Sequence, residues 1–432
     1  MRRLIPLLLT AVLLLGGCGS TAAAPEPTPA PTPAPTLAPT PVPTPEPAPE
    51  PTPEPAAEQL PVSLDLADTL AGRLTDGRYQ TDELFEAGTV ITLSAEEPIG
   101  SLYLLFGTYP EEWTLRSDGH EQTCGTNRFL HEYVRLEAPS RTVELCLPEG
   151  QDLVIGDIAA FSVGYPPEWV QDWQAPDEYA DILLFSTHAD DELLFMGGLI
   201  PYYAAVRGLR VQVVYMTSNY DPANRSPYSL NYRFRPHEAL NGLWIAGDRV
   251  YPITNMVPDK SCDTVWDAER IYGKDQFAAF QTELIRRFRP LVVVTQDENG
   301  EYGHGAHILT ARSVERAVEA AADPEQFPDS AARYGLWDTP KTYLHEYGPD
   351  EELTVLSYEE PSEALGGLTP FEAAQAAYSA HLTQHQWDVF FIYDYGMPHD
   401  SHLFGLYRSL VGPDEDKNDL MEHLSREQFP AD

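Results

Sequence analysis

From residue 181 onward, short apolar runs alternate with longer stretches of helical periodicity, and this alternation is the strongest constraint on the fold. Strand-like runs are expected at residues 181–186, 211–217, 249–253, 291–295 and 342–344. Helical patterns lie near residues 191–207, 235–246, 275–288, 306–322 and 370–386. Strands that alternate with helices in this way form parallel sheets covered by helices. We therefore expect residues 175–432 to form an α/β domain around a mostly parallel sheet.

The loops that follow two of the expected strands contain residue types that bind metals. Residues 187–192 (THADDE) follow the first strand, and residues 303–307 (GHGAH) follow the fourth. Sites in open α/β sheets lie beyond the carboxyl ends of the strands. A histidine and an aspartate three residues apart, completed by a histidine from another strand end, form the ligand set that zinc takes in hydrolytic sites. A surface histidine pair and a solvated acidic helix start are the alternatives, but the position of both motifs after buried strands favours a metal site.

The spacing of these motifs resembles that of the PIG-L/LmbE-like zinc-dependent N-acetylglucosaminyl de-N-acetylases, whose motifs are PHPDDE and HPDH. The resemblance implies a Rossmann-like sheet, a Zn2+ cofactor and hydrolysis of an acetamide on a sugar. It implies that His188, Asp191 and His307 bind the metal, that Asp190 is the general base, that His304 stabilises the oxyanion and that Arg235 faces the substrate. Residues 380–384 (AHLTQ) resemble a late helical segment of many members.

The chain departs from the family motifs at four positions. Thr187 and Ala189 stand where the family has prolines, which removes stiffness from the first loop. Gly305 and Ala306 stand where the family has Pro-Asp. Every implied ligand and the implied base are present. The departures therefore bear on the substrate, and they leave the identity of the sugar open.

The N-terminus has the pattern of a bacterial lipoprotein signal peptide. Arg2 and Arg3 precede an apolar run, residues 4–15, that is short for a permanent transmembrane helix. Residues 15–18 (LGGC) resemble a lipobox, which implies cleavage before Cys18 and lipidation of that cysteine. The alternative is an ordinary secretory peptide. We therefore expect residues 1–18 to direct the protein to the extracytoplasmic face of the cell membrane.

A proline-rich spacer is expected at residues 19–59. Residues 25–55 contain 15 prolines, alternating with Thr, Ala and Glu. Such a chain lacks amide donors and favours extended polyproline II. We expect this segment to hold the folded part away from the membrane.

Residues 60–174 show short strand patterns without long helical periods, typical of a small all-β sandwich. Residues 74–81 (LTDGRYQT) resemble the start of galactose-binding-like jelly rolls, which implies a sugar-binding module; a purely structural sandwich is the alternative. Cys124 and Cys146 lie in this region, and whether they form a disulfide is open. Trp169 and Trp173 are expected to pack at the joint to the next domain.

The charge balance excludes nucleic acid as a partner. The chain has 67 acidic and 27 basic side chains, a net charge of −40, whereas affinity for phosphates depends on clusters of Lys and Arg. Two functions remain: a surface-tethered zinc deacetylase of an N-acetylated sugar or glycan, and a glycan-binding lipoprotein with a silent metal site. The presence of Asp190 beside the implied ligands favours the enzyme.

Overall fold

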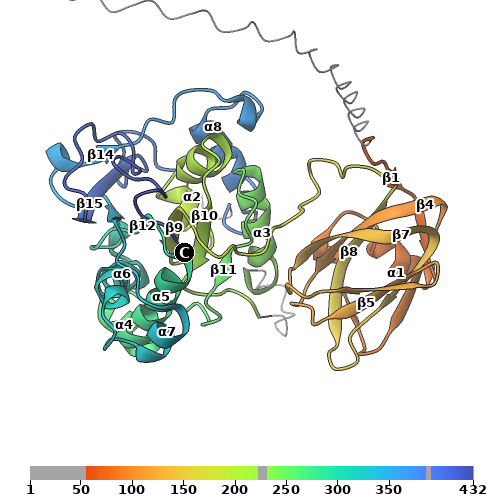
Figure 1. Cartoon of the computed structure of the whole chain (residues 1–432). Helices are drawn as coiled ribbons and strands as arrows, with labels where there is room; N and C mark the ends of the chain where they lie inside the picture. The colour runs from red at the N-terminus through yellow and green to blue at the C-terminus, as the bar shows by residue number, and fades with distance from the viewer. Residues whose placement is uncertain (1–54, 222–230, 386–390, 432) are drawn as a thin grey trace, which may run out of the picture. The chain divides into compact units, whose positions relative to one another are not determined.

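The computed structural model describes residues 55–221, 231–385 and 391–431 (Figure 1). The expected signal peptide with Cys18 and most of the expected spacer lie outside these residues. The described chain is a mixed α/β protein with two sheets, one of eight strands and one of seven. Among the described residues no helix is both long and apolar enough to cross a membrane.

The first sheet is antiparallel and is built from residues 59–161. Its strands are β1 (Gln59–Leu60), β2 (Val62–Leu64), β3 (Glu83–Phe85), β4 (Val90–Phe106), β5 (Trp113–Ser117), β6 (His120–Cys124), β7 (His131–Cys146) and β8 (Leu153–Phe161), with the short helices α1 (Asp68–Arg73) and η1 (Tyr79–Thr81) beside them. The strand order is β1-β8-β4-β7-β5-β6. Backbone pairing connects all of these strands into one sheet. The expected two-layer sandwich and the expected domain boundary near residue 174 therefore remain predictions.

The two cysteines of this sheet are unpaired. Cys124 lies opposite Trp113 on one side of β5, and Cys146 lies opposite Thr114 on its other side. Strands are about 4.8 Å apart, so two cysteines separated by an intervening strand are too distant for a disulfide. Both are free thiols, as is Cys262.

The second sheet confirms the expected mostly parallel arrangement. Its order is β11-β10-β9-β12-β13-β15-β14. The parallel strands are β9 (Ile182–Ser186), β10 (Val211–Tyr215), β11 (Ile253–Thr254), β12 (Val292–Thr295) and β13 (Lys341–His345). The expected strand at 249–253 is shorter and begins later. Beyond β13 the sheet continues with β15 (Leu403–Ser409), which is antiparallel to β13, and ends with the edge strand β14 (Thr354–Val355); neither was expected.

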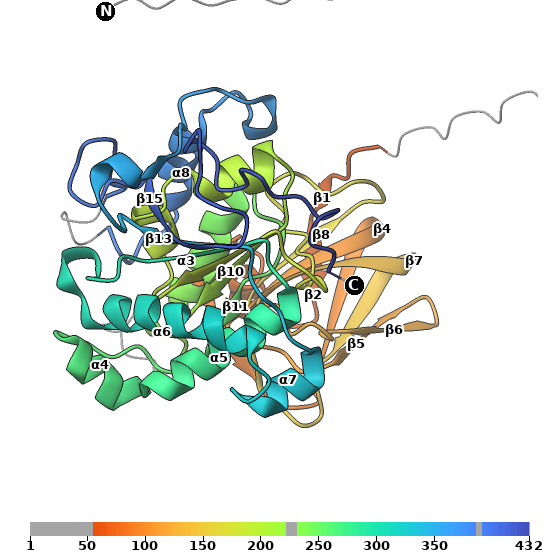
Figure 2. The same cartoon turned by 60° about the vertical axis from the view of Figure 1, so that its left-hand side comes forward.

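Helices cover both faces of this sheet (Figure 2). They are α2 (Asp191–Leu194), η2 (Pro201–Val206), α3 (Asn231–Ile245), α4 (Val265–Tyr272), α5 (Lys274–Phe288), η3 (Glu301–Gly303), α6 (Gly305–Ala322), α7 (Pro328–Tyr334), η4 (Asp350–Glu352), η5 (Glu363–Leu365) and α8 (Pro370–Tyr378). Alternate residues of each strand face opposite sides. Leu183 and Phe185 of β9 join the core under α5 and α6, whereas Ile182 and Leu184 join the core on the opposite side.

The expected single helix over residues 191–207 is wrong. Helix α2 ends after one turn, and the π-helical turn η2 begins only at Pro201. Gly197 between them has φ 45°, and a Cβ at Gly198 would lie 2.7 Å from the ring of Tyr358. The Gly-Gly pair thus permits a left-handed turn and a close approach that other residues would block. The last expected helix is also shorter and ends at Tyr378.

Candidate metal centre

The two aspartates of the loop that follows β9 have different surroundings. Asp191 begins α2, and its Oδ2 accepts hydrogen bonds from the backbone N–H of His188 at 2.9 Å and from Gln296 at 3.2 Å. Asp190 has φ 141°, a conformation that L-residues rarely adopt. The adjacent carboxylates thus have different partners, His188 and Gln296 for Asp191 and Arg235 for Asp190.

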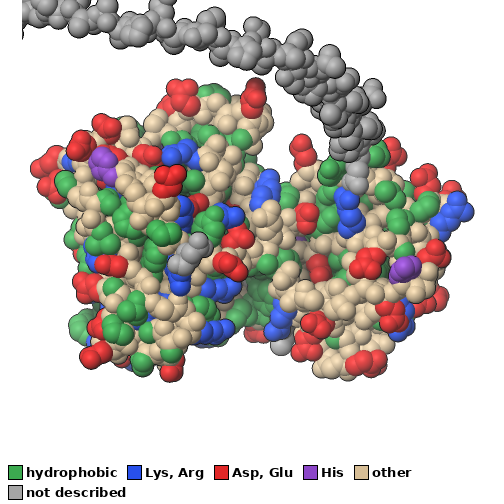
Figure 3. Space-filling view, viewed as in Figure 1, with side chains coloured by type: hydrophobic (Ala, Val, Ile, Leu, Met, Phe, Trp, Pro, Cys, Tyr) green, Lys and Arg blue, Asp and Glu red, His purple; other side chains and the backbone are tan. Residues whose placement is uncertain are grey.

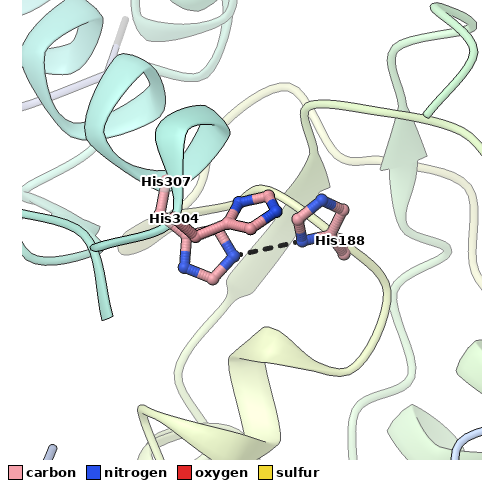
Figure 4. A group of neighbouring side chains, drawn as sticks. All are labelled: His188, His304 and His307. Atoms are coloured by element: carbon pink, nitrogen blue, oxygen red, sulfur yellow. Dashed lines mark hydrogen bonds between the residues drawn. The ribbon is translucent and has the colours of Figure 1, made fainter. Parts of the chain in front are cut away.

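Three candidate ligand atoms converge at this turn, from the loop after β9, from α2 and from α6. His188 Nδ1 lies 2.9 Å from Asp191 Oδ2 and 3.1 Å from His307 Nε2, and His307 Nε2 lies 3.2 Å from Asp191 Oδ2. Figure 4 shows the two imidazoles facing each other, with His304 beside them. His188, His304 and His307 also form a group with one nitrogen each within 4.8 Å of one another. The chain thus brings together all of the residues predicted to bind metal.

The donor set fits a small divalent cation. Zinc–nitrogen bonds of about 2.05 Å in a tetrahedral site place neighbouring ligand atoms about 3.3 Å apart, close to the three separations observed. Burial alone would lower the pKa of His188, but Asp191 and Asp259 raise it to about 10. Likewise burial is outweighed at His307, where Asp191 and Glu301 raise the pKa to about 9. The centre therefore stabilises positive charge, whether carried by protons or by a metal.

Asp190 is held by an arginine and a neighbouring glutamate. The guanidinium of Arg235, on α3, forms an ion pair with the Asp190 carboxylate and donates to the Ala189 carbonyl at 2.9 Å. The Asp190 backbone N–H donates to Glu192 at 2.9 Å, and Tyr215 donates to the same carboxylate at 2.8 Å. Burial raises the pKa of Asp190 to about 6, although Arg235 opposes the rise. Arg235 thus lies in the site, but against the predicted base.

His304 precedes α6 and differs from His307 in its surroundings. Its Nδ1 is buried without a hydrogen-bond partner, and its ring centre lies 5.0 Å from that of His188. Burial, together with the neighbouring His307 and His188, lowers the pKa of His304 to about 3. A neutral imidazole with a free nitrogen at the edge of the metal ligands can donate a hydrogen bond to a bound oxygen.

Two further buried residues complete the centre, and the sequence analysis missed both. Glu301 accepts hydrogen bonds from His307 Nδ1 at 2.8 Å and from His345 Nδ1 at 2.9 Å. His345 also donates from Nε2 to the carbonyl of Asp400 at 3.0 Å. A metal-binding histidine is usually oriented by such a carboxylate on its second nitrogen. His345 ends β13, so the rule that sites follow strand ends could have found it.

Asp259 supports His188 from the other side of its ring. Its Oδ1 lies 3.4 Å from His188 Nε2, and its Oδ2 accepts a hydrogen bond from Asn219 at 3.1 Å. Burial would raise the pKa of Asp259, but His188 and then Arg235 hold it well below its usual range. No motif in the sequence pointed to this residue.

The remaining residues singled out from the sequence have different outcomes. Buried His381 lies against α3, and Thr383 donates to Glu238 from its backbone and hydroxyl at 2.9 and 2.6 Å. His402 pairs with Asp400 at 2.9 Å, away from the metal ligands. The sequence also holds a cluster of aromatic residues between positions 387 and 395, of which Trp387 and Phe390 lie outside the described residues. Trp173 is buried as expected, whereas Trp169 is half exposed.

The chain is similar to known sugar deacetylases. The family described as GlcNAc-PI de-N-acetylase (PIG-L) matches residues 183–318. The 1D-myo-inositol 2-acetamido-2-deoxy-alpha-D-glucopyranoside deacetylase of Mycolicibacterium gilvum is 31% identical over 230 residues, 47% of this chain and 80% of that protein. Deacetylase 1 of the same name from Catenulispora acidiphila is 31% identical over 190 residues, 39% of this chain and 56% of that protein. The chain thus spans little more than half of the Catenulispora protein.

Among solved structures, the N,N'-diacetylchitobiose deacetylase of Pyrococcus horikoshii is similar over part of the chain. The two share 19% identity, with a TM-score of 0.36, over 49% of this chain and 73% of that one.

Proposed function

Since the chain belongs to the GlcNAc-PI de-N-acetylase (PIG-L) family, we propose that it is a zinc-dependent hydrolase. The reaction removes the acetyl group from an N-acetylated sugar or glycan. The main support is that His188 Nδ1, Asp191 Oδ2 and His307 Nε2 lie within 3.2 Å of one another. Asp190, the expected general base, precedes Asp191 in the chain. When bound by these three residues, zinc lowers the pKa of a water molecule and polarises a carbonyl oxygen.

Side chains of the protein then transfer the protons and stabilise the negative charge that develops on the carbonyl oxygen. Asp190 accepts the proton of the attacking water and returns it to the amide nitrogen, since an amine leaves readily only when protonated. The C–N bond breaks, and the products are acetate and the free amino sugar. His304 donates a hydrogen bond to the carbonyl oxygen as it becomes an oxyanion. Arg235 holds the carboxylate of Asp190 in place through their ion pair.

A binding protein with a silent metal site is not favoured. Asp190 is buried, adopts a strained φ of 141° and is held by Arg235 and Glu192. Strained residues of this kind persist where the surrounding structure holds them in place, and they are concentrated at active sites. Nothing in glycan capture requires such a carboxylate beside three metal ligands.

The direct test uses the purified protein loaded with zinc. We expect one bound zinc per chain and release of a free amine from N-acetylglucosamine or its oligomers. Removal of zinc by a chelator should abolish the activity, and added zinc should restore it. A zinc-loaded protein that releases no amine from N-acetylated sugars of any chain length would contradict the proposed reaction.

We also propose that the enzyme is lipid-anchored at Cys18 on the extracytoplasmic face of the cell membrane, with the proline-rich spacer between membrane and enzyme. The substrate is then a cell-surface glycan. Figure 3 shows acidic side chains spread over the visible face, and the whole chain has a net charge of −40. This negative charge favours a neutral glycan over a polyanionic one.

The anchor is tested by substitution of Cys18. We expect Cys18→Ala to leave an unprocessed precursor or to release the protein from the membrane fraction, because no thiol remains to carry the lipid. Fractionation of cells and the mass of the mature N-terminus measure this. Normal processing and unchanged membrane association of the variant would show that Cys18 is not the anchor.

A further inference from the structure

A row of aromatic rings leads away from the metal centre. Tyr302 lies 5.5 Å from His307, measured between ring centres, and Phe195 lies 6.1 Å from Tyr302. Tyr393 stacks on Phe195 at 5.4 Å with an interplanar angle of 17°, and Phe391 lies 5.1 Å from Tyr393. We call these four residues, Tyr302, Phe195, Tyr393 and Phe391, the aromatic wall. It is assembled from three segments that are distant in the sequence.

The aromatic wall is buried at its centre and open at its ends. Phe195 is fully buried, whereas 52% of Tyr302 and 43% of Phe391 are exposed to solvent. Large apolar side chains that gather at the surface beside a polar site indicate a binding surface. Tyr302 and Phe391 therefore offer ring surface to a ligand, and Tyr302 does so beside the metal centre.

Backbone hydrogen bonds hold the wall in place. The N–H of Tyr302 donates to His399 Nε2 at 3.1 Å, and this contact holds Tyr302 at φ 48°. The backbone of Tyr393 donates to the Leu194 carbonyl at 3.2 Å and accepts from Ser401 at 3.1 Å. A surface that is already ordered loses little conformational entropy when a ligand binds.

We infer that the aromatic wall is a subsite for the sugar ring next to the one that is deacetylated, so that the substrate is an oligosaccharide. This inference rests on the proposed function. A pyranose has an apolar C–H face and hydroxyls at its edge, so it stacks on an aromatic ring while its hydroxyls stay in water. The wall begins 5.5 Å from His307, so a ring linked to the reacting sugar reaches it without leaving the site.

The test compares a short and a long substrate. The zinc-loaded full chain and its variants are assayed on the methyl glycoside of N-acetylglucosamine and on its β-1,4-linked tetramer. We expect the unsubstituted enzyme to have a higher kcat/KM for the tetramer. Phe391→Ala should reduce the tetramer-to-monomer ratio of kcat/KM about 2- to 12-fold, mainly through KM, because one stacking contact is lost.

Two further variants at Phe391 and one distant control make the result specific. Phe391→Leu keeps apolar volume without a flat ring and should reduce the ratio, whereas Phe391→Tyr should restore it. Leu410 is 44% exposed and follows β15, at the end of the sheet opposite to the metal centre. Leu410→Ala should keep the ratio of the unsubstituted enzyme.

The outcomes separate this inference from the proposed function. If the enzyme deacetylates both substrates with the same kcat/KM and the Phe391 variants leave the ratio unchanged, the subsite is refuted and the deacetylase proposal stands. If the enzyme releases no amine from either substrate, the proposed function itself fails, and the subsite fails with it.

Discussion

Asp190 and Asp191 are neighbours in the chain, yet their surroundings shift their pKa values in opposite directions. Burial raises the pKa of Asp190 to about 6. Burial acts in the same direction on Asp191, but His307 and His188 outweigh it and hold that pKa well below its usual range. A carboxylate that stays ionised suits a metal ligand, and one with a pKa near neutrality suits a proton carrier.

Substitutions in this centre should separate metal ligands from proton-transfer groups. We expect Asp191→Ala and His307→Ala to lose zinc and activity together, because each removes a ligand atom. Asp190→Asn should retain zinc and lose about 10²–10⁴ in turnover, the usual contribution of positioned acid–base catalysis. His304→Ala should retain zinc and lose about 10²–10³, the contribution of one oxyanion donor. Metal content and steady-state kinetics of the same preparations measure both effects.

The difference between His304 and His307 is the sharpest part of this prediction. If His304→Ala strips the metal while His307→Ala keeps it, the ligand and the oxyanion donor are assigned the wrong way round. If Asp190→Asn is fully active with zinc bound, the general base lies elsewhere.

Glu301 should act on zinc affinity without touching the metal. It accepts hydrogen bonds from His307 and His345, and an amide at this position cannot accept both. We expect Glu301→Gln to weaken zinc binding about 10- to 100-fold, the usual effect of losing a carboxylate that orients a ligand. Competition with a chelator measures the affinity. Glu298→Gln is the control, since Glu298 lies in the same loop and is only half-buried; equal zinc affinity of the two variants would refute the role of Glu301.

At the scale of helices, α6 carries His307 and its far end is fixed by one buried arginine. Arg286, on α5, donates to the carbonyls of Ala320, Ala321 and Asp323 at 2.7–3.2 Å. It also donates to the carbonyls of Gln326 and Phe327 and to the hydroxyl of Ser330. The carbonyls at a helix C-terminus have no partner within the helix, and here a single guanidinium supplies the donors.

Removing this guanidinium should destabilise the α5–α6 pair. Arg286→Met keeps most of the volume but leaves several buried carbonyls unpaired, and we expect a loss of about 3–5 kcal/mol in the free energy of unfolding. Urea unfolding followed by tryptophan fluorescence measures the change. Arg270→Met should cause no resolvable change, because 75% of that side chain is exposed. A similar stability of both variants would show that the carbonyls find other partners.

At the scale of the whole molecule, two buried histidines connect the antiparallel sheet to α3. His131 of β7 accepts a hydrogen bond at Nε2 from His237 Nδ1 at 2.8 Å and donates from Nδ1 to Gln171 at 2.7 Å. Burial lowers the pKa of His131 to about 4 and that of His237 well below its usual range. Both rings are neutral in the folded chain, whereas in the unfolded chain they become protonated below about pH 6.5.

This connection should weaken in acid. Because the folded pKa is lower than the unfolded one, the unfolded chain binds protons first as the pH falls, and stability is lost between pH 6.5 and 4. For His131 alone the loss is about 2 kcal/mol at pH 5. Urea unfolding at pH 7.5, 6 and 5 should show a smaller pH-dependent loss for His131→Gln than for the unsubstituted protein. Equal losses would mean that His131 is not the group responsible.

Much of the α/β part could be predicted from the sequence, because its signals are local. The apolar runs at 181–186 and 291–295 form strands almost as expected, and parallel pairing brings their carboxyl ends together. Hence the sequence alone predicts that residues 187–192 and 303–307 meet in one site, although more than a hundred positions separate them. The residue types and their positions after buried strands were sufficient.

The tertiary structure decided what depends on contacts between distant segments. No periodicity shows that Arg235 pairs with Asp190, that Glu301 lies between His307 and His345, or that an intervening strand separates Cys124 from Cys146. Nor does it show the aromatic wall, whose rings come from the residue that follows α2, from η3 and from the segment after residue 390. Sequence patterns report which face of an element is buried. Which side chains then meet is set by packing, where burial and charge at close range choose the partners.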